Sequence, residues 1–143
     1  MTTPNDTVQH RWFEEVWNKG RADAIDELGA PDVLGHGLVD ADGNEVRGVE
    51  AFKSFYEKFR SAFPDIQITV EDTVSEGDKV LARCHVKATH TGEGLGFPPT
   101  NKPVDFTGMC LIRIENGKIA ESWNSFDFLT MFQQLGVINF PNA

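Results

Sequence analysis

The sequence predicts an α+β domain: a cone-shaped α+β barrel in which a curved antiparallel sheet is covered by N-terminal helices, with an aromatic-lined space between them. Three observations support this fold class. Apolar residues recur at helical spacing in the first part of the chain, they alternate with a period of two from residue 65 onward, and a short helical pattern follows at the end. With 143 residues and no internal repeat or linker, residues 1–143 are expected to form a single domain.

Helical patterns dominate the first part of the chain. An amphipathic helix is predicted from about residue 6 to 19, where Gly20 stops it, and a short second helix is predicted within RADAIDELG. Two short extended pieces follow, joined by a turn at Asp42-Gly43. The next segment, from Val49 to Phe63, has a strongly aromatic helical face and is closed by a proline.

Strand patterns dominate the second part. Residues 66–70 and 80–88 alternate apolar with polar side chains on either side of the turn Glu76-Gly77-Asp78, so they are predicted to be antiparallel neighbours. After the loop TGEGLGFPPTNKP, residues 104–115 and KIAESWNSF form a predicted hairpin with its turn at Asn116-Gly117. A last helix is expected from residue 127 to 135.

Charge and cysteine content narrow the function classes. The 22 acidic and 13 basic residues give a net charge of −9, which argues against nucleic-acid or anionic-membrane binding and favours a small neutral or organic ligand. The N-terminal sequence lacks the pattern of a signal peptide, and no apolar stretch has membrane-spanning length, so a cytoplasmic location is expected. Cys84 and Cys110 lie within predicted strands, where they are expected to be reduced core residues.

Asp127 is the leading catalytic candidate. If strand alternation continues to the end of the last strand, one face is shared by Ile119, Glu121, Trp123, Ser125 and Asp127, and the carboxyl group follows Trp123 toward the apolar side. Desolvation there would raise its pKa and make it a better base toward a carbon acid. The alternative is that Asp127 caps the following helix, and both roles can coexist.

Two histidines are candidate partners of that carboxylate. His36 lies in the glycine-flanked stretch LGHGL, and His90 continues the apolar parity of residues 80–88, so either side chain could hydrogen-bond a carbonyl oxygen or carry a proton. A purely structural role is the alternative for each. Neither a metal-ligand spacing nor a nucleophile motif is present, so no metal site is expected.

Several stretches together resemble the SnoaL-like polyketide cyclase family, which belongs to the nuclear-transport-factor-like and ketosteroid-isomerase-like fold group. They are AFPD at 62–65, ATHTGEGLGFPPTNKPV at 88–104 and LIRIENGKIAESWNSFDFLTMFQQLG at 111–136. The resemblance implies a cone of curved sheet and helices, a homodimer and no cofactor. It also implies an intramolecular aldol closure in which an aspartate after the last strand is the general acid/base. Asp127 matches that aspartate and His36 matches a pocket histidine of the family.

The resulting hypothesis is a cofactor-independent enzyme that removes a proton next to a carbonyl group of a small apolar substrate. Asp127 would be the base, and His36 with His90 would bind the enolate oxygen. The expected substrate contacts are Trp12, Phe59, Phe63, Met109, Leu111 and Trp123, although aromatic residues at such spacing usually fill a core. Two alternatives stay open: a hydrolase or hydroxylation-type enzyme with Glu121 as a second carboxylate, and a non-catalytic binding module.

Overall fold

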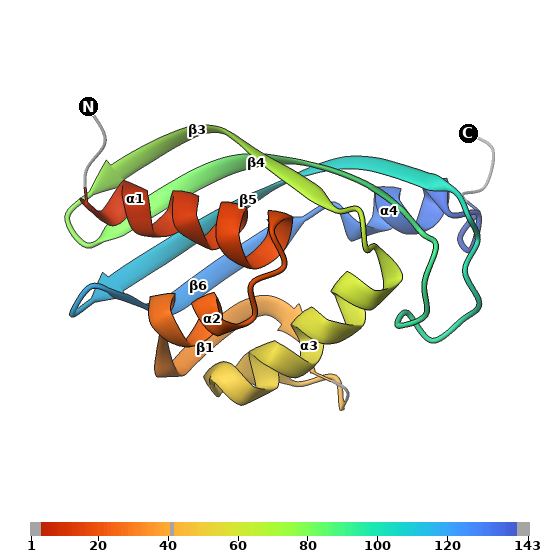
Figure 1. Ribbon diagram of the computed structural model, residues 1–143. Coiled ribbons are helices and arrows are strands. Elements are labelled where there is room, and N and C mark those ends of the chain that lie inside the picture. Colours follow the sequence, from red (N-terminus) through yellow and green to blue (C-terminus); the bar gives the residue numbers. More distant parts are fainter. Residues whose placement is uncertain (1–3, 41, 140–143) are drawn as a thin grey trace.

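The computed structural model describes residues 4–40 and 42–139. A curved six-stranded sheet has the strand order β2-β1-β6-β5-β4-β3, and Figure 1 shows α1, α2 and α3 gathered on one side of it, with α4 near one end. The α+β class and the helix-covered curved sheet are therefore confirmed. The sheet stays open, with β2 and β3 at its edges, so the barrel is incomplete.

The helices lie close to where the apolar spacing predicts them. They are α1 (Pro4–Arg11), α2 (Asp23–Leu28), α3 (Gly48–Ala62) and α4 (Phe128–Gln134). One difference is that α1 continues into η1, a π-helix over Trp12–Asn18, in which Lys19 N–H donates to the carbonyl oxygen of Glu14 at 2.9 Å. Hydrogen bonds across five residues widen the helix locally, and such segments are often found at functional sites.

Six strands make up the sheet. They are β1 (Gly29–Val39), β2 (Glu45–Arg47), β3 (Gln67–Glu76), β4 (Lys79–Thr89), β5 (Pro103–Glu115) and β6 (Lys118–Phe126). The meander from β3 to β6 is antiparallel as predicted, but β1 is a full-length strand that pairs parallel to β6. That pairing joins the two halves of the chain, and short-range sequence patterns do not predict it.

The concave face of the sheet forms one wall of the core. In β4 the predicted apolar row is buried, including Cys84, and its outward neighbours are more exposed. Cys110 is also buried, at 2 % exposure, which confirms the expectation that both cysteines lie in the core. No helix in the described part of the chain is long and apolar enough to span a bilayer.

A β-bulge at Ala120 overturns one prediction about β6. Ile114 pairs with Ile119, whereas Arg113 pairs with Glu121, so Ala120 is an extra residue on β6. An extra residue reverses which side chains face which way. Ile119 faces the core, but beyond the bulge Ser122 and Asn124 face it, and Trp123 faces away. The prediction that Ile119, Trp123 and Asp127 share one face is therefore wrong.

Candidate functional site

An aromatic cavity lies between the concave sheet face and the helices. The space between its walls is about 770 Å³ when the open mouth is counted, and the centre of a water molecule can reach about 70 Å³ of it. The cavity is therefore narrow, which suits a flat ligand better than a bulky one. It is lined by Trp12, Phe13, Trp17, Val33, Gly35, Leu38, Val46, Phe52, Phe55, Phe59, Ile66, Ile68, Val86, Phe106, Cys110, Ile112, Ile119, Ser122, Asn124, Phe126 and Phe128.

The π-helix explains how two tryptophans reach the same wall. Trp12 and Trp17 are five residues apart, a spacing that an α-helix places on different faces and a π-helix brings close together. Both rings contact Phe52 of α3, with centroids 4.9 and 6.1 Å from it. Phe55 and Phe59 extend this aromatic wall along α3.

Ser122 and Asn124 of β6 form the polar edge of the cavity. Asn124 Nδ2 donates to the backbone oxygen of His36 at 2.9 Å and to Ser122 Oγ at 3.0 Å. Among the described residues that line the cavity, none is Asp, Glu, His, Lys or Arg. The strongest hydrogen-bonding groups of the wall are therefore a neutral amide and a hydroxyl group.

Cys110 also reaches the cavity, but its surroundings keep its thiol protonated. Burial raises the pKa of Cys110 to about 12, against an ordinary value of 9.0. Since the thiolate is the reactive form of cysteine, this side chain is an apolar wall group rather than a nucleophile.

Asp127 lies outside the cavity and caps α4. Its Oδ1 accepts from the backbone N–H of Thr130 at 3.0 Å, and its Oδ2 accepts from Thr130 Oγ1 at 2.6 Å. These hydrogen bonds stabilise the anion and lower the pKa of Asp127, and the side chain is exposed beside a shallow groove on the outer sheet face. The raised pKa expected for a desolvated base is therefore not found. The catalytic assignment of Asp127 stays a prediction, while its contacts are those of a helix cap.

His36 lies on the outer face of the sheet. Its Nδ1 is 3.0 Å from Glu45 Oε1, its Nε2 is 2.6 Å from Glu121 Oε2, and its ring stacks on Trp123 at 5.3 Å. The two carboxylates raise the pKa of His36, with Glu121 as the larger cause. His36 follows the inward-facing Gly35 along β1, so its side chain lies on the face opposite the cavity.

His90 is fully buried, but it does not line the cavity. Thr100 N–H donates to His90 Nδ1 at 3.1 Å, so the ring hydrogen is on Nε2, which has no hydrogen-bond partner among the described residues. Its ring contacts Phe63 and Phe97, with centroids 5.5 and 5.4 Å away. His90 thus holds the loop between β4 and β5 in place. This is the structural role that was the alternative to a catalytic one.

The expected substrate contacts divide between two faces of the sheet. Trp12 and Phe59 line the cavity, whereas Phe63 is completely buried behind it. Met109, Leu111 and Trp123 line a groove on the outer face. In β5 the inward positions are Cys110 and Ile112, and the buried alternation of that strand could have indicated this.

Sequence reasoning missed Ser122, Asn124 and Gly35. If alternation is continued from Ile119, Ser122 and Asn124 are predicted to face away from the core. No residue pattern signals the bulge that reverses this prediction. Glu121, the second carboxylate of the hydrolase alternative, lies on the outer face, bonded to His36 and 3.4 Å from Arg113. Within the described ranges, no three His, Cys, Asp or Glu side chains are grouped so that they could hold a metal ion.

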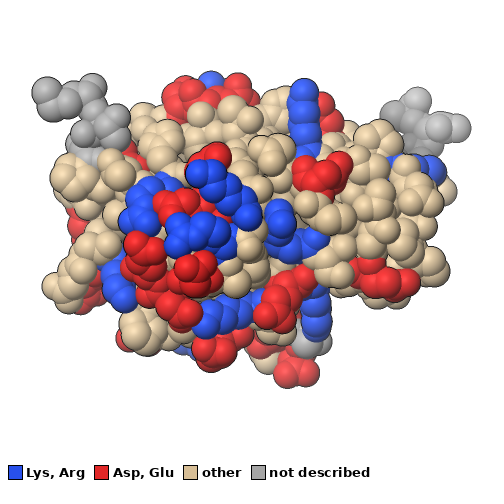
Figure 2. All heavy atoms as spheres, in the orientation of Figure 1, with Lys and Arg blue, Asp and Glu red and all other residues tan. Residues whose placement is uncertain are grey.

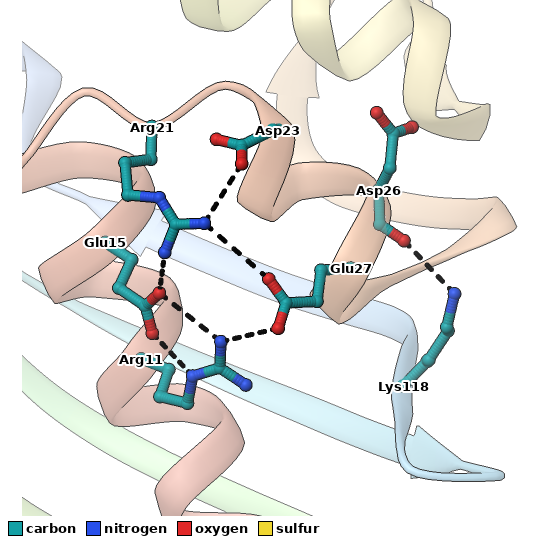
Figure 3. A network of polar contacts seen from close by, with 7 residues as sticks. All are labelled: Arg11, Glu15, Arg21, Asp23, Asp26, Glu27 and Lys118. Carbon is teal, nitrogen blue, oxygen red and sulfur yellow. Dashed lines mark hydrogen bonds and ion pairs between the residues drawn. The ribbon is translucent and has the colours of Figure 1, made fainter.

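Charged side chains cluster on the helices beside the cavity rather than within it. Figure 2 shows that Lys and Arg on this face lie next to Asp and Glu, without a continuous basic patch. Figure 3 shows the centre of the cluster, where Arg11 bonds Glu15 at 2.5 Å and Glu27 at 2.8 Å. Arg21 also bonds Glu15, so the network ties α1, η1 and α2 together over the sheet.

Comparisons with known proteins agree with this architecture. The family model described as SnoaL-like polyketide cyclase matches residues 7–135. Aklanonic acid methyl ester cyclase of Streptomyces peucetius is 31% identical over 137 residues, which are 95% of this chain and 92% of that protein. Nogalonic acid methyl ester cyclase of Streptomyces nogalater is 30% identical over 122 residues, or 85% and 90% of the two chains. The crystal structure of IdmH of Streptomyces antibioticus, a proposed polyketide cyclase, is similar with a TM-score of 0.79 and 34% identity, covering 93% of this chain and 99% of IdmH.

Proposed function

Because the chain belongs to the SnoaL-like polyketide cyclase family and is an enzyme of that cyclase type, we propose that it closes a ring within an apolar, polyketide-derived carbonyl substrate. The two cyclases reported above are named for methyl esters of aklanonic and nogalonic acid, so esters of this kind are the first substrates to consider. In such a closure a carbon next to one carbonyl loses a proton and bonds to a second carbonyl carbon. The resulting alkoxide takes up a proton, so substrate and product are isomers.

The observation that carries the proposal is an aromatic cavity with one polar edge. The apolar walls exclude water and hold two parts of a flexible substrate together. Binding therefore lowers the entropy cost that ring closure adds to the reaction barrier. In such surroundings a single well-placed hydrogen-bond donor stabilises developing negative charge on oxygen far more than it would in water.

We assign that donor role to the hydroxyl group of Ser122, held by the amide of Asn124. Ser122 Oγ accepts from Asn124 Nδ2, so its own hydrogen can point to a substrate carbonyl oxygen. Since the described cavity wall holds no carboxylate, imidazole or amine, proton transfer is assigned to water at the cavity mouth. A mechanism with Asp127 as base differs from this one in a testable way.

Turnover of the two methyl esters by the purified protein tests the proposal. Liquid chromatography with mass spectrometry should show an isomer of unchanged mass that forms faster than without protein. Ser122→Ala should lower kcat about a hundredfold, as removal of an oxyanion donor does. Asp127→Asn should leave kcat within about twofold, because Asn also caps helices well.

The contrary outcomes separate the competing functions. Loss of turnover in Asp127→Asn, with the wild-type unfolding temperature, would identify Asp127 as the base and refute the role of the polar edge. Binding of both esters without any isomer formation would favour the binding-module alternative.

We further propose that the outer sheet face is a homodimer interface. In Figure 1 the described helices α1, α2 and α3 lie on the opposite side of the sheet, and on the outer face Met109 is 46% exposed beside Leu111 and Trp123 in an apolar groove. Side chains of both charges form ion pairs around the groove, and one of these pairs joins Arg83 to Asp72 at 3.1 Å. A second copy would offer the same apolar centre and a charge rim that can complement it.

A further inference from the structure

The amide of Asn124 has a defined orientation. Its two N–H groups are both used, one on the backbone oxygen of His36 and one on Ser122 Oγ. Turning the amide over would place its Oδ1 against the backbone oxygen of His36, so that two acceptors would face each other, which is unfavourable. The hydrogen bonds of the described residues leave Oδ1 without a partner, so Asn124 offers the cavity an acceptor.

Ser122 offers the complementary group. Its oxygen accepts from Asn124, and among the described residues its hydroxyl hydrogen has no acceptor. The polar edge therefore presents one acceptor and one donor side by side in an otherwise apolar wall. Such a pair matches a ligand that carries a donor and an acceptor on neighbouring positions.

We propose that this edge recognises a hydroxyl group next to a carbonyl group, as in an aromatic hydroxyketone or the enol form of a 1,3-dicarbonyl compound. Asn124 Oδ1 accepts from the ligand hydroxyl in a three-centre hydrogen bond, in which the hydrogen is shared with the ligand's own carbonyl oxygen, and the Ser122 hydroxyl donates to that carbonyl oxygen. The inference rests on the proposed function and adds that such a 1,3-dicarbonyl substrate binds as the enol, in which the proton lost by the carbon is carried by the hydroxyl group. A 1,3-diketone has no hydroxyl hydrogen, so it would set its oxygen against Oδ1 and leave that acceptor unpaired, which binding sites discriminate against strongly.

The stretch LGHGL builds this edge from the neighbouring strand. A Cβ atom at Gly37, which has φ +81°, would lie 1.8 Å from the backbone oxygen of Asn124, so only glycine allows β1 and β6 to approach this closely. That approach brings the backbone oxygen of His36 to Asn124 Nδ2. At Gly35, a Cβ atom would lie 3.6 Å from Ser122 Oγ, in ordinary contact, so its absence leaves room for a ligand beside the hydroxyl group.

Three matched ligands test the proposal: 1-hydroxy-2-acetonaphthone, its methyl ether, and 2-acetonaphthone, which lacks the hydroxyl group. Their dissociation constants are measured by quenching of tryptophan fluorescence in Trp123→Phe, so that the cavity residues Trp12 and Trp17 give the signal. The hydroxyketone should bind about five- to tenfold more tightly than either other ligand, the value of one hydrogen bond.

Variants in this background assign the two contacts. Asn124→Leu should make the three dissociation constants similar, because it removes the acceptor for the ligand hydroxyl group. Ser122→Ala should weaken the binding of all three ligands by a similar factor, because each of them carries the carbonyl group. Ser125→Ala, on the same strand but facing the outer groove, is the matched control and should change none of them. Circular dichroism and unfolding temperatures establish that each variant is folded.

The possible failures are distinct. Equal affinity of the three ligands for the parent protein would refute recognition of the hydroxyl group and leave cavity binding intact. A preference that persists in Asn124→Leu would refute the role of Asn124. No binding of any ligand would count against the cavity itself, and so against the proposed function.

Discussion

His36 shows how a side chain can be prominent in the sequence and still lie outside the cavity. Its imidazole sits between two carboxylates on the outer sheet face, and Arg113 neutralises part of the charge of Glu121. The raised pKa of His36 and the lowered pKa of Glu121 have the same origin, since each group is the first cause of the shift in the other. Both groups are therefore charged at a pH that lies between their two folded-state pKa values.

This pair should make stability depend on pH in a predictable direction. The pKa of His36 is raised above its ordinary value of 6.5, so its contribution is complete below pH 6.5 and is lost as pH rises through the folded-state pKa. The pKa of Glu121 is lowered from 4.5, so its contribution is lost as pH falls through its own folded-state value. The unfolding temperature of wild type should exceed that of His36→Gln most between about pH 4.5 and 6.5, and the difference should shrink toward pH 9. A difference independent of pH would contradict the charged pair.

At the scale of single residues, the sequence predicted which side chains are buried better than it predicted which of them offer hydrogen bonds to a ligand. Burial of Cys84, Cys110 and His90 followed from strand alternation, because alternation is a local property of extended backbone. The acceptor and donor at Ser122 and Asn124 did not follow, because their direction depends on the bulge at Ala120 and on a contact with a strand 88 residues away.

Among the elements, β1 departs most from expectation. Both extended pieces predicted around the turn at Asp42-Gly43 are found, but the first of them is an 11-residue strand rather than a short one, and it is interrupted by register shifts against both of its neighbours. Local periodicity is weak there because glycines occupy positions that other strands fill with apolar side chains. The elements with strong periodicity, α3 and strands β4 to β6, were predicted almost to the residue, whereas β3 continues to Glu76, well beyond the predicted residues 66–70.

Alanine substitutions at Gly37 and Gly43 should separate backbone strain from close packing. Both glycines have φ near +80°, but a Cβ atom at Gly43 would meet nothing within 4 Å, whereas at Gly37 it would collide with β6. Gly43→Ala should lower the free energy of unfolding by about 1–2 kcal/mol, the cost of a left-handed conformation. Gly37→Ala should lower it by about 3 kcal/mol or more, because the strands must also move apart. Equal losses in urea unfolding would mean that β1 and β6 do not approach so closely.

At the scale of the whole molecule, the two faces of the sheet differ in character. The concave face holds the aromatic cavity under the helices, and the network around Arg11 and Glu15 ties those helices together. The convex face is covered by none of the helices in the described part of the chain, and it carries an apolar groove with ion pairs around it. The sequence predicted the aromatic space but assigned Met109, Leu111 and Trp123 to it, because it could not show which face of each strand the helices cover.

A single charge on the convex face should control assembly. Light scattering coupled to size-exclusion chromatography should give about twice the chain mass for wild type and one chain mass for Met109→Asp, since a carboxylate in an apolar interface loses its hydration. Ser54→Asp adds the same charge on an exposed position of α3 and should remain dimeric. A monomeric wild type, or a dimeric Met109→Asp, would exclude this interface.

The bulge at Ala120 determines which side chains of β6 face the cavity. One residue decides which of two interleaved sets, Ser122 with Asn124 or Glu121 with Trp123, faces the ligand and which faces the outside. A relative that kept this residue but paired it opposite Arg113 without a bulge would exchange the two sets without any substitution, and its pocket would then hold a carboxylate and an indole. A change in the pairing register of this hairpin is thus a short evolutionary route between different active-site chemistries on one scaffold.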